Sequence, residues 1–451
     1  MLRISFNTLL LTVGALFLSY STLQYIDHRR TNDDDQRITL RTSMSHPSLL
    51  GGTTQRTYIK VDLTGFKLDK ETQKTPVNVA LVLDKSGSMN GEKMMQAKAA
   101  AMEAVDRLGD GDIVTIITYD NTAQVLLPAT EVSDKRIIRQ KLQNLEAGGG
   151  TALYAGVVEG ANQLREYLSE NRVNRVILLS DGQANQGPET PEELGALGNS
   201  LIKDGISVST IGLGLGYNED LMVQLAMRSD GNHHFVEHPD LLAGMFNQEF
   251  GDVLSVVAQD VKVTIELEDG IRPISVMGRN AQIDGQIVEV SLNQVYSEQE
   301  KYIMLEVETS SEERSGEVEI AQVDLSYSNM LTQTTDHLRN AISANFTNSH
   351  AEVDENIDAE TMVSAIEQQA VVMEEKAIEL RDQGLESEAQ EMLQQNAAFL
   401  DDNASKFDSD KLAKDAERSR GAASNLSGQD WNAQRKALRS DHYKAKTQQK
   451  N

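Results

Sequence analysis

One stretch of the chain limits the possible folds more than any other. Residues 77–83 are almost entirely apolar, and Asp84, Ser86 and Ser88 follow them directly. An apolar run of this length is typical of a strand buried on both faces, as the inner strands of parallel sheets are. The carboxylate and the two hydroxyls should therefore lie at the carboxyl end of an inner strand, where open α/β sheets bind ligands.

The sequence after this stretch alternates between strand and helix patterns. Strands are predicted at residues 77–84, 112–120, 124–127, 175–180, 206–212 and 233–236, and helices at residues 91–108, 134–145, 152–168, 191–203, 218–227 and 239–256. Such alternation predicts an α/β fold, with a doubly wound and mostly parallel sheet that carries helices on both faces.

The side chains at the end of the first of these strands all offer oxygen atoms. A carboxylate with hydroxyl groups suits hard cations such as Mg²⁺ or Mn²⁺, and suits zinc or copper poorly. The alternative interpretation is that Asp84 or Ser86 caps the helix that follows. A cap accounts for one such residue at a helix start, so further ligands elsewhere in the chain would favour a metal site.

Residues 84–89, Asp-Lys-Ser-Gly-Ser-Met, resemble the metal-ion-dependent adhesion site of von Willebrand factor type A domains. That family completes the site with a Gly-rich loop ending in Thr, which residues 148–151 match, and with an Asp after the fourth strand, which Asp181 matches. The resemblance implies a Mg²⁺ or Mn²⁺ site formed by Asp84, Ser86, Ser88, Thr151 and Asp181. The hydroxyls would bind the ion directly, whereas the two carboxylates in this family often act through water. The resemblance also implies that an Asp or Glu of a partner protein completes the coordination.

Other candidate sites carry weaker signals. His233, His234 and His238 are possible zinc ligands, but neighbouring residues of a strand point to opposite faces. The glycines of residues 212–216 lack the spacing of a nucleotide-binding loop. No pattern of a Ser-His-Asp triad is present, so we expect a protein that is not an enzyme. The alternative is metal-assisted hydrolysis, for which Asp84 and Asp181 are the only evident bases.

Composition excludes some classes of partner. The chain has 42 basic and 69 acidic residues and a net charge of −27. Nucleic acid is therefore not an expected partner, because phosphate binding needs clustered Lys and Arg. The chain has no cysteine, which excludes disulfides and thiolate zinc sites. Its 451 residues suffice for roughly two or three domains.

The N-terminal region has the pattern of an export signal. Arg3 precedes an apolar core at residues 9–18, so we assign residues 1–26 to a signal peptide or membrane anchor. Residues 4–26 are long enough for anchoring in a membrane if some polar residues are tolerated. Residues 27–55 are polar and irregular, and are interpreted as a linker. The expected location is exported: periplasmic, membrane-anchored or secreted.

Strand patterns of another kind flank the α/β region. Residues 57–69 alternate between apolar and polar, and so do residues 261–267, 288–292, 303–307 and 318–320. Alternation predicts half-buried antiparallel strands. We therefore expect a β-sandwich from residues 56–75 and 257–330, into which the type A domain of residues 76–256 is inserted. The alternative is a β-hairpin lid on the α/β domain.

The remainder of the chain is polar and mostly helical in pattern. Residues 331–407 predict a helical hairpin in which Gly384 ends the first helix. Residues 408–451 have few apolar anchors and are interpreted as a poorly ordered tail. The alternative is a docking segment, formed by Trp431 and the basic residues Arg435, Lys436, Arg439, Lys444, Lys446 and Lys450.

The layout resembles bacterial exported proteins of this family, with some similarity to inter-alpha-trypsin-inhibitor heavy chains. The first predicted strand begins near residue 56, so too few residues precede it for the large N-terminal domain of the heavy chains. The resemblance thus implies a cell-envelope protein that binds a partner protein by a divalent cation, for adhesion or interaction. The alternative is a scaffold or assembly factor for a membrane complex.

Overall fold

A computed structural model describes residues 36–69, 74–426, 431–447 and 449–450 of the chain. The expected signal peptide or anchor at residues 1–26 lies outside the described residues. Within these described ranges, no helix combines the length and the apolar character needed to cross a membrane.

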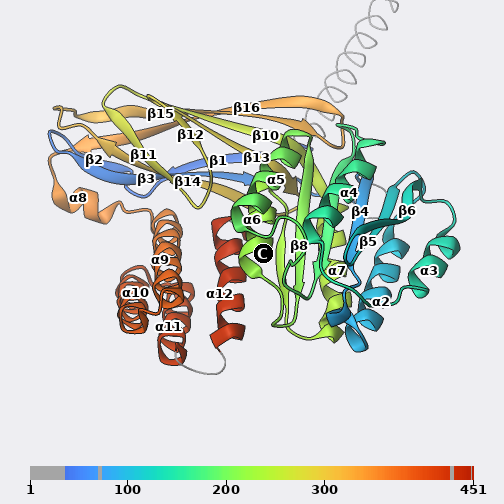
Figure 1. The fold of residues 1–451 in the computed structure, drawn as a ribbon. Helices are drawn as coiled ribbons and strands as arrows, with labels where there is room; N and C mark the ends of the chain where they lie inside the picture. Colours follow the sequence, from blue (N-terminus) through green and yellow to red (C-terminus); the bar gives the residue numbers. More distant parts are fainter. Residues whose placement is uncertain (1–35, 70–73, 427–430, 448, 451) are drawn as a thin grey trace, which may run out of the picture.

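The α/β domain is built on a six-stranded sheet in the order β6-β5-β4-β7-β8-β9 (Figure 1). Its strands are β4 (Val77–Asp84), β5 (Ile113–Tyr119), β6 (Ala123–Glu131), β7 (Val173–Ser180), β8 (Ile206–Leu213) and β9 (His233–Val236). All neighbouring strands are parallel except β6, which pairs with β5 in the antiparallel sense. The predicted fold class, a mostly parallel doubly wound sheet, is confirmed.

Helices cover both faces of this sheet. They are α2 (Glu92–Arg107), α3 (Lys135–Gln143), α4 (Leu153–Arg165), α5 (Pro191–Lys203), α6 (Glu219–Arg228) and α7 (Leu242–Val253), with the short 3-10 turns η1 (Gly87–Met89) and η2 (Pro239–Leu241). Successive residues of β4 face opposite layers: Val79 and Leu81 pack with α2, α3 and α7, whereas Ala80 and Val82 pack with α4, α5 and α6. Burial of both faces explains why this strand is almost entirely apolar.

A β-sandwich flanks the α/β domain. One sheet contains β1 (Thr39–Met44), β3 (Gln55–Thr64), β14 (Glu300–Thr309), β11 (Ile271–Met277) and β17 (Gln449–Lys450); the other contains β12 (Gln282–Asp284), β13 (Ile287–Tyr296), β10 (Val256–Leu267), β15 (Gly316–Asn329), β16 (Thr334–Thr347) and β2 (Ser48–Leu50). Ile59 of β3 lies opposite Leu305 of β14. The chain therefore leaves the sandwich after β3, forms the α/β domain and returns at β10, so the early strand is not part of a hairpin lid.

Two sequence assignments around the sandwich are wrong. Part of the expected linker at residues 27–55 forms β1 and β2, and the first part of the expected helical region forms β16. In β16 only the second half shows buried alternation, at Ile342, Ala344 and Phe346. β1 and β2 are short strands at the edges of their sheets. Short or half-polar edge strands carry too little periodicity to be recognised in sequence.

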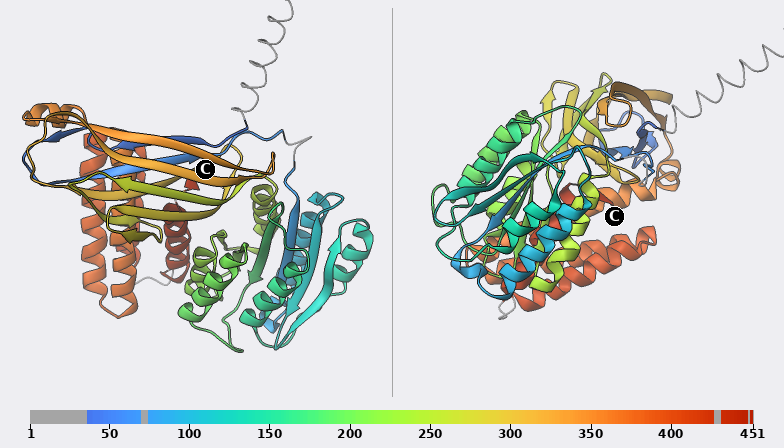
Figure 2. Two further views of the ribbon diagram at one scale, coloured as in Figure 1. Left: turned by 90° about the horizontal axis from the view of Figure 1, so that it is seen from above. Right: turned by 90° about the vertical axis from the view of Figure 1, so that its right-hand side faces the viewer.

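The C-terminal region contains more helices than expected. They are α8 (His350–Glu355), α9 (Ala359–Asp382), α10 (Glu386–Phe407), α11 (Asp410–Asn425) and α12 (Trp431–Lys446). Between α9 and α10, Gly384 has φ +82°, and the Leu385 N–H donates to the Leu380 carbonyl at 2.9 Å. This is the predicted glycine helix end. Figure 2 shows that the long sandwich strands run from these helices to the α/β domain.

The interpretation of residues 408–451 as a poorly ordered tail is wrong. α11 packs on α10 and α9, and α12 packs between α9 and the α/β domain, against α6 and β9 (Figure 1). Polar contacts fix α12: Lys436 donates to the Tyr217 carbonyl at 2.7 Å, and Arg435 pairs with Asp220 at 2.7 Å. Few apolar anchors are needed because the basic side chains of α12 meet acidic residues at the start of α6.

A buried polar cluster joins the α/β domain to the sandwich. Arg175 of β7 is fully buried, and its guanidinium contacts Glu249 of α7 at 2.9 Å and the Tyr296 hydroxyl of β13 at 3.0 Å. His234 of β9 contacts the other oxygen of Glu249 at 3.1 Å. The charges of Arg175, Glu249 and His234 are balanced within the α/β domain, and the Tyr296 hydroxyl joins this cluster to the sandwich.

Asp252, at the edge of this cluster, gives the junction a dependence on pH. Burial, with a further contribution from Glu249, raises the pKa of Asp252 to about 6. The folded state therefore disfavours the ionised carboxylate, so Asp252 costs stability above pH 6 and costs none below its ordinary pKa. We expect Asp252→Asn to raise the free energy of unfolding by about 1–2 kcal/mol at pH 7.5.

Urea denaturation at two pH values checks this expectation. The gain from Asp252→Asn should shrink as the pH falls from 6 and disappear below the ordinary pKa of 3.8, where the wild-type carboxyl is protonated in both states. A variant that is less stable than wild type at pH 7.5 would show that the ionised carboxylate is favoured by the fold.

Candidate metal centre

The first part of the candidate site lies at the carboxyl end of β4. Asp84 is completely buried; one of its oxygens accepts a hydrogen bond from the Ser86 N–H at 2.8 Å. The other accepts from the hydroxyl of Ser180, also at 2.8 Å. Ser180 is the last residue of β7, the neighbouring parallel strand. Burial raises the pKa of Asp84, and the hydrogen bonds from Ser86 and Ser180 oppose that rise.

A chain of close oxygen atoms continues from there to the next strand. The hydroxyls of Ser86 and Ser88 are 2.9 Å apart, and Ser88 donates to Asp181 Oδ1 at 2.6 Å. Ser86 and Asp181 are buried, whereas Ser88 is exposed at the mouth of the site. Parallel pairing of β4 with β7 places Asp84 and Asp181 at the same sheet edge although they are far apart in sequence.

The Gly-rich loop brings Thr151 to the same place. A Cβ atom added to Gly182 would lie 3.3 Å from the Ser88 hydroxyl and 3.5 Å from the Thr151 hydroxyl, so both hydroxyls face this glycine. The loop is held to the β4 turn, because the Gly87 N–H donates to the Gly149 carbonyl at 3.1 Å. Asn185 accepts from the Thr151 N–H at 2.9 Å. All five predicted residues thus gather at one sheet edge.

The donor set fits a hard divalent cation. An octahedral Mg²⁺ has ligands at about 2.0–2.1 Å, which places neighbouring ligand oxygens about 2.9 Å apart. The 2.9 Å separation of the Ser86 and Ser88 hydroxyls matches that spacing. The five side chains supply only oxygen, from three hydroxyls and two carboxylates. Within the described residues there is no group of three or more His, Cys, Asp or Glu placed to hold a metal, so a site dominated by those ligands is not found there.

Two lysines at the site were not predicted from the sequence. Lys93, in the first turn of α2, contacts Asp181 Oδ2 at 2.5 Å. Lys85 pairs with Asp120 after β5. The Lys93 ammonium offsets one of the two negative charges of the donor set. No sequence signal indicates this contact, because it depends on how α2 lies over the end of β7.

The histidines of β9 serve the packing of the domain. His233 Nδ1 lies 2.8 Å from the Thr210 hydroxyl, whereas His234 contacts Glu249 in the buried cluster. The two rings thus have different partners, as the alternation of a strand predicts. The glycine loop of residues 212–216 lies behind the metal centre. A Cβ atom on Gly216 would lie 2.7 Å from the Asp181 carbonyl oxygen, so a larger residue there would collide with the backbone of Asp181.

Comparisons with known proteins agree with this geometry. The family model described as the von Willebrand factor type A domain matches residues 78–248. An uncharacterized protein from Synechocystis sp. is 28% identical over 280 residues, which cover 60% of this chain and 66% of that protein. The human inter-alpha-trypsin inhibitor heavy chain H3 is 27% identical over 35% of this chain and 18% of its own length. The matches thus span less than two thirds of these relatives.

A solved structure extends the likeness beyond the α/β domain. The von Willebrand factor type A protein from Catenulispora acidiphila superposes with a TM-score of 0.70 at 17% identity, covering 85% of this chain and 89% of that one. At this identity the likeness concerns the fold alone. Together with the family match and the converged motif, it leads to one conclusion. Residues 78–248 form a von Willebrand factor type A domain.

Proposed function

We propose that the protein binds Mg²⁺ or Mn²⁺ at this centre and uses it to capture a partner protein through an Asp or Glu side chain. Domains of this family generally mediate metal-dependent protein–protein interaction, and commonly hold a divalent ion at this motif. The observation that carries the proposal is the convergence of the ligand set at one sheet edge, which consists of Asp84, Ser86, Ser88, Thr151 and Asp181.

The donor set explains how a carboxylate would be attracted. Three of the five side chains are neutral hydroxyls, and Lys93 already offsets part of the charge of Asp181. A divalent ion bound here keeps positive charge and supplies a coordination position for one more anionic oxygen. Both oxygens of Asp84 accept hydrogen bonds, from Ser86 and Ser180, which favours leaving that position to another carboxylate.

The surface around the centre also suits an acidic partner. Six exposed residues there are uncharged: Gly87, Ser88, Asn90, Asn121, Gln183 and Asn185. The charged residues beside them are the partly exposed Lys85 and Lys93 and the exposed Glu92. A chain with a net charge of −27 would ordinarily repel an acidic protein. These uncharged residues and the two lysines lessen the repulsion where the carboxylate must approach, and the amides can donate hydrogen bonds to the partner.

The cellular setting remains part of the proposal. Residues 1–26 favour export, and hence a partner in the cell envelope, for adhesion or for assembly of a membrane complex. We propose a binding protein and not an enzyme. The metal-assisted hydrolase is the alternative; against it, both oxygens of Asp84 already accept hydrogen bonds, and Asp181 is paired with Ser88 and Lys93.

Affinity capture from an envelope extract tests the function. Immobilised full-length protein should retain its partner in Mg²⁺ or Mn²⁺ and release it when a chelator is added. Asp84→Ala and Thr151→Ala should lose capture, whereas Thr122→Ala, an exposed threonine outside the ligand set, should retain it. Circular dichroism of each variant checks that the fold survives. Undiminished capture in chelator would show that the metal is not the bridge.

A further inference from the structure

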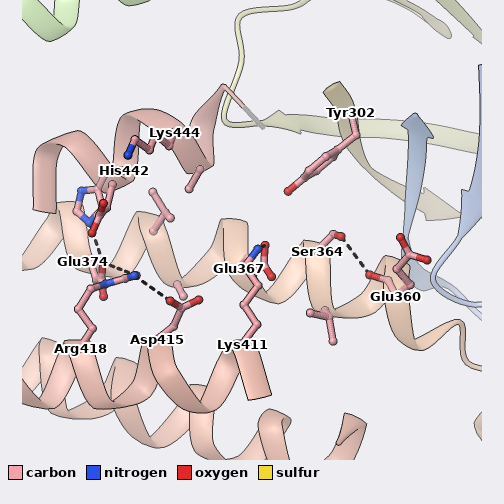
Figure 3. A pocket seen from close by; sticks show the side chains of 15 residues that line it. Tyr302, Glu360, Ser364, Glu367, Glu374, Lys411, Asp415, Arg418, His442 and Lys444 are labelled. Atoms are coloured by element: carbon pink, nitrogen blue, oxygen red, sulfur yellow. Dashed lines mark hydrogen bonds and ion pairs between the residues drawn. The ribbon is translucent and has the colours of Figure 1, made fainter. Parts of the chain in front are cut away.

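The cavity among the C-terminal helices has a wall that contains paired charges. It lies between α9, α11 and α12 and has a volume of about 580 Å³ (Figure 3). Glu374 of α9 contacts His442 of α12 at 2.7 Å and Arg418 of α11 at 3.8 Å. Lys411 of α11 pairs with Glu367 of α9 at 2.7 Å. These pairs join the three helices and so serve their packing, whereas polar side chains at the metal centre hold a loop that carries a ligand.

Two asparagines from different segments hold the Gly-rich loop of residues 148–151. Asn121, which follows β5, accepts a hydrogen bond from the Gly150 N–H at 2.9 Å. Asn185, which follows β7, accepts one from the Thr151 N–H at 2.9 Å, and its own backbone N–H donates to the Thr151 carbonyl at 3.2 Å. The peptide groups on both sides of Thr151 are therefore fixed by residues outside the ligand set.

Gly150 makes room for these two amides. A Cβ atom at this position would lie 2.8 Å from Asn121 Oδ1 and 3.0 Å from Asn185 Oδ1, which is closer than ordinary van der Waals contact. The φ of Gly150 lies outside the left-handed region, so the backbone conformation does not demand a glycine. The close approach of both amide oxygens to the same residue does demand one.

A fixed backbone at Thr151 also fixes the direction of its hydroxyl. Threonine is branched at Cβ, so few χ1 rotamers remain open once the backbone is set. Thr151 is 4% exposed, and its hydroxyl faces Gly182 together with the hydroxyl of Ser88. A ligand that is ordered before the ion arrives binds it more tightly, because less freedom is lost on binding.

We propose that Asn121 and Asn185 are positioning residues of the metal centre, which hold the Thr151 hydroxyl in place for the ion. This inference rests on the proposed function, since it concerns a divalent ion held by the five ligands. Both side chains act here as hydrogen-bond acceptors, so the amide oxygen is the group that matters. Asn185 should have the larger effect, because it binds the backbone on both sides of Thr151.

Titration of the full chain with Mn²⁺, followed by electron paramagnetic resonance, tests this inference. Loss of a group that orients a metal ligand typically lowers affinity about 10–100-fold. Asn185 is exposed, so we expect a loss of about tenfold for Asn185→Leu and of several-fold for Asn121→Leu. Asn185→Asp retains the acceptor oxygen and should bind Mn²⁺ at least as tightly as wild type. Asn171→Leu is the control, at an exposed asparagine before the opposite end of β7.

A second substitution separates positioning from a general effect on the fold. In a Thr151→Ala background there is no hydroxyl to orient, so adding Asn185→Leu should lower Mn²⁺ affinity by less than about twofold. Hydrogen exchange of the metal-free protein provides a second readout. The segment that contains Gly150 and Thr151 should exchange faster in Asn185→Leu than in wild type.

Each result supports or overturns the inference. Wild-type affinity for Mn²⁺ in both leucine variants would overturn it and leave the metal centre intact. So would a loss in Asn185→Asp as large as in Asn185→Leu, or an equal loss with and without the Thr151 hydroxyl. If Asn185→Leu does not fold, Asn121→Leu allows the same comparison. If the wild type itself does not bind Mn²⁺, the proposed function fails, and this inference fails with it.

Discussion

Asp181→Asn should lower the affinity of the metal centre for Mn²⁺ by about a hundredfold, since it removes one of two carboxylates from a site that otherwise offers hydroxyls. Asp181 is buried, and its Oδ1 lies 2.6 Å from the Ser88 hydroxyl. The amide has nearly the same shape, so packing should change little. Titration of Mn²⁺ followed by electron paramagnetic resonance measures the free ion directly, without knowledge of the partner.

Substitution of Lys93 should change the affinity for Mn²⁺ in the opposite direction. Its ammonium lies 2.5 Å from Asp181 Oδ2, where it repels a nearby cation and holds one ligand oxygen. Lys93→Met should therefore raise Mn²⁺ affinity several-fold. Lys98→Met is the control, because Lys98 lies on the same helix and contacts the Gln143 carbonyl instead. If Asp181→Asn binds Mn²⁺ as tightly as wild type, the ion is held elsewhere.

The α/β core and the candidate ligands could be predicted because both follow from local pattern. Burial on both faces makes β4 apolar throughout, and parallel pairing brings the ends of β4 and β7 to one edge. Asp84 and Asp181 therefore meet once β4 and β7 are paired. Thr151 and Asp181 were both assigned through the family resemblance, since neither a Gly-rich loop nor an Asp after a later strand shows by itself which residues it will meet.

What could not be predicted depends on contacts between distant segments. α12 has few apolar residues, and its place is set by pairs such as Arg435 with Asp220 and Lys436 with the Tyr217 carbonyl. Neither residue of such a pair indicates its partner in the sequence. The same holds for Lys93 beside Asp181. From the sequence alone, a charged residue is expected to lie in solvent unless the residue that pairs with it is known.

The docking of α12 also connects the C-terminal helices with the metal centre. Asn432 donates to the Leu215 carbonyl at 3.3 Å, and Lys436 to that of Tyr217. These carbonyls belong to the loop between β8 and α6, where Gly216 lies against the Asp181 carbonyl. α12, which packs on α9, therefore also supports the loop behind the metal ligand.

Arg175→Met should destabilise the protein by about 3–5 kcal/mol, the cost of leaving a buried charge without its partner. Arg175 and Glu249 are both completely buried. Burial by itself acts to raise the pKa of Glu249, but Arg175 and His234 hold it well below the ordinary value. Without Arg175 the carboxylate loses its main compensation, and Gln294 and Tyr296 of the sandwich lose their contact with β7.

The double variant Arg175→Met/Glu249→Leu separates charge from packing. Replacing a buried ion pair by apolar side chains of similar volume is often neutral or stabilising, so the double variant should recover most of the loss. Urea denaturation of the wild type and the two variants provides the measurement. Recovery would show that the buried pair contributes little net stability and that the loss in the single variant comes from the unpaired carboxylate. If the single variant is within about 1 kcal/mol of wild type, water reaches Glu249 and the junction is looser than the contacts indicate.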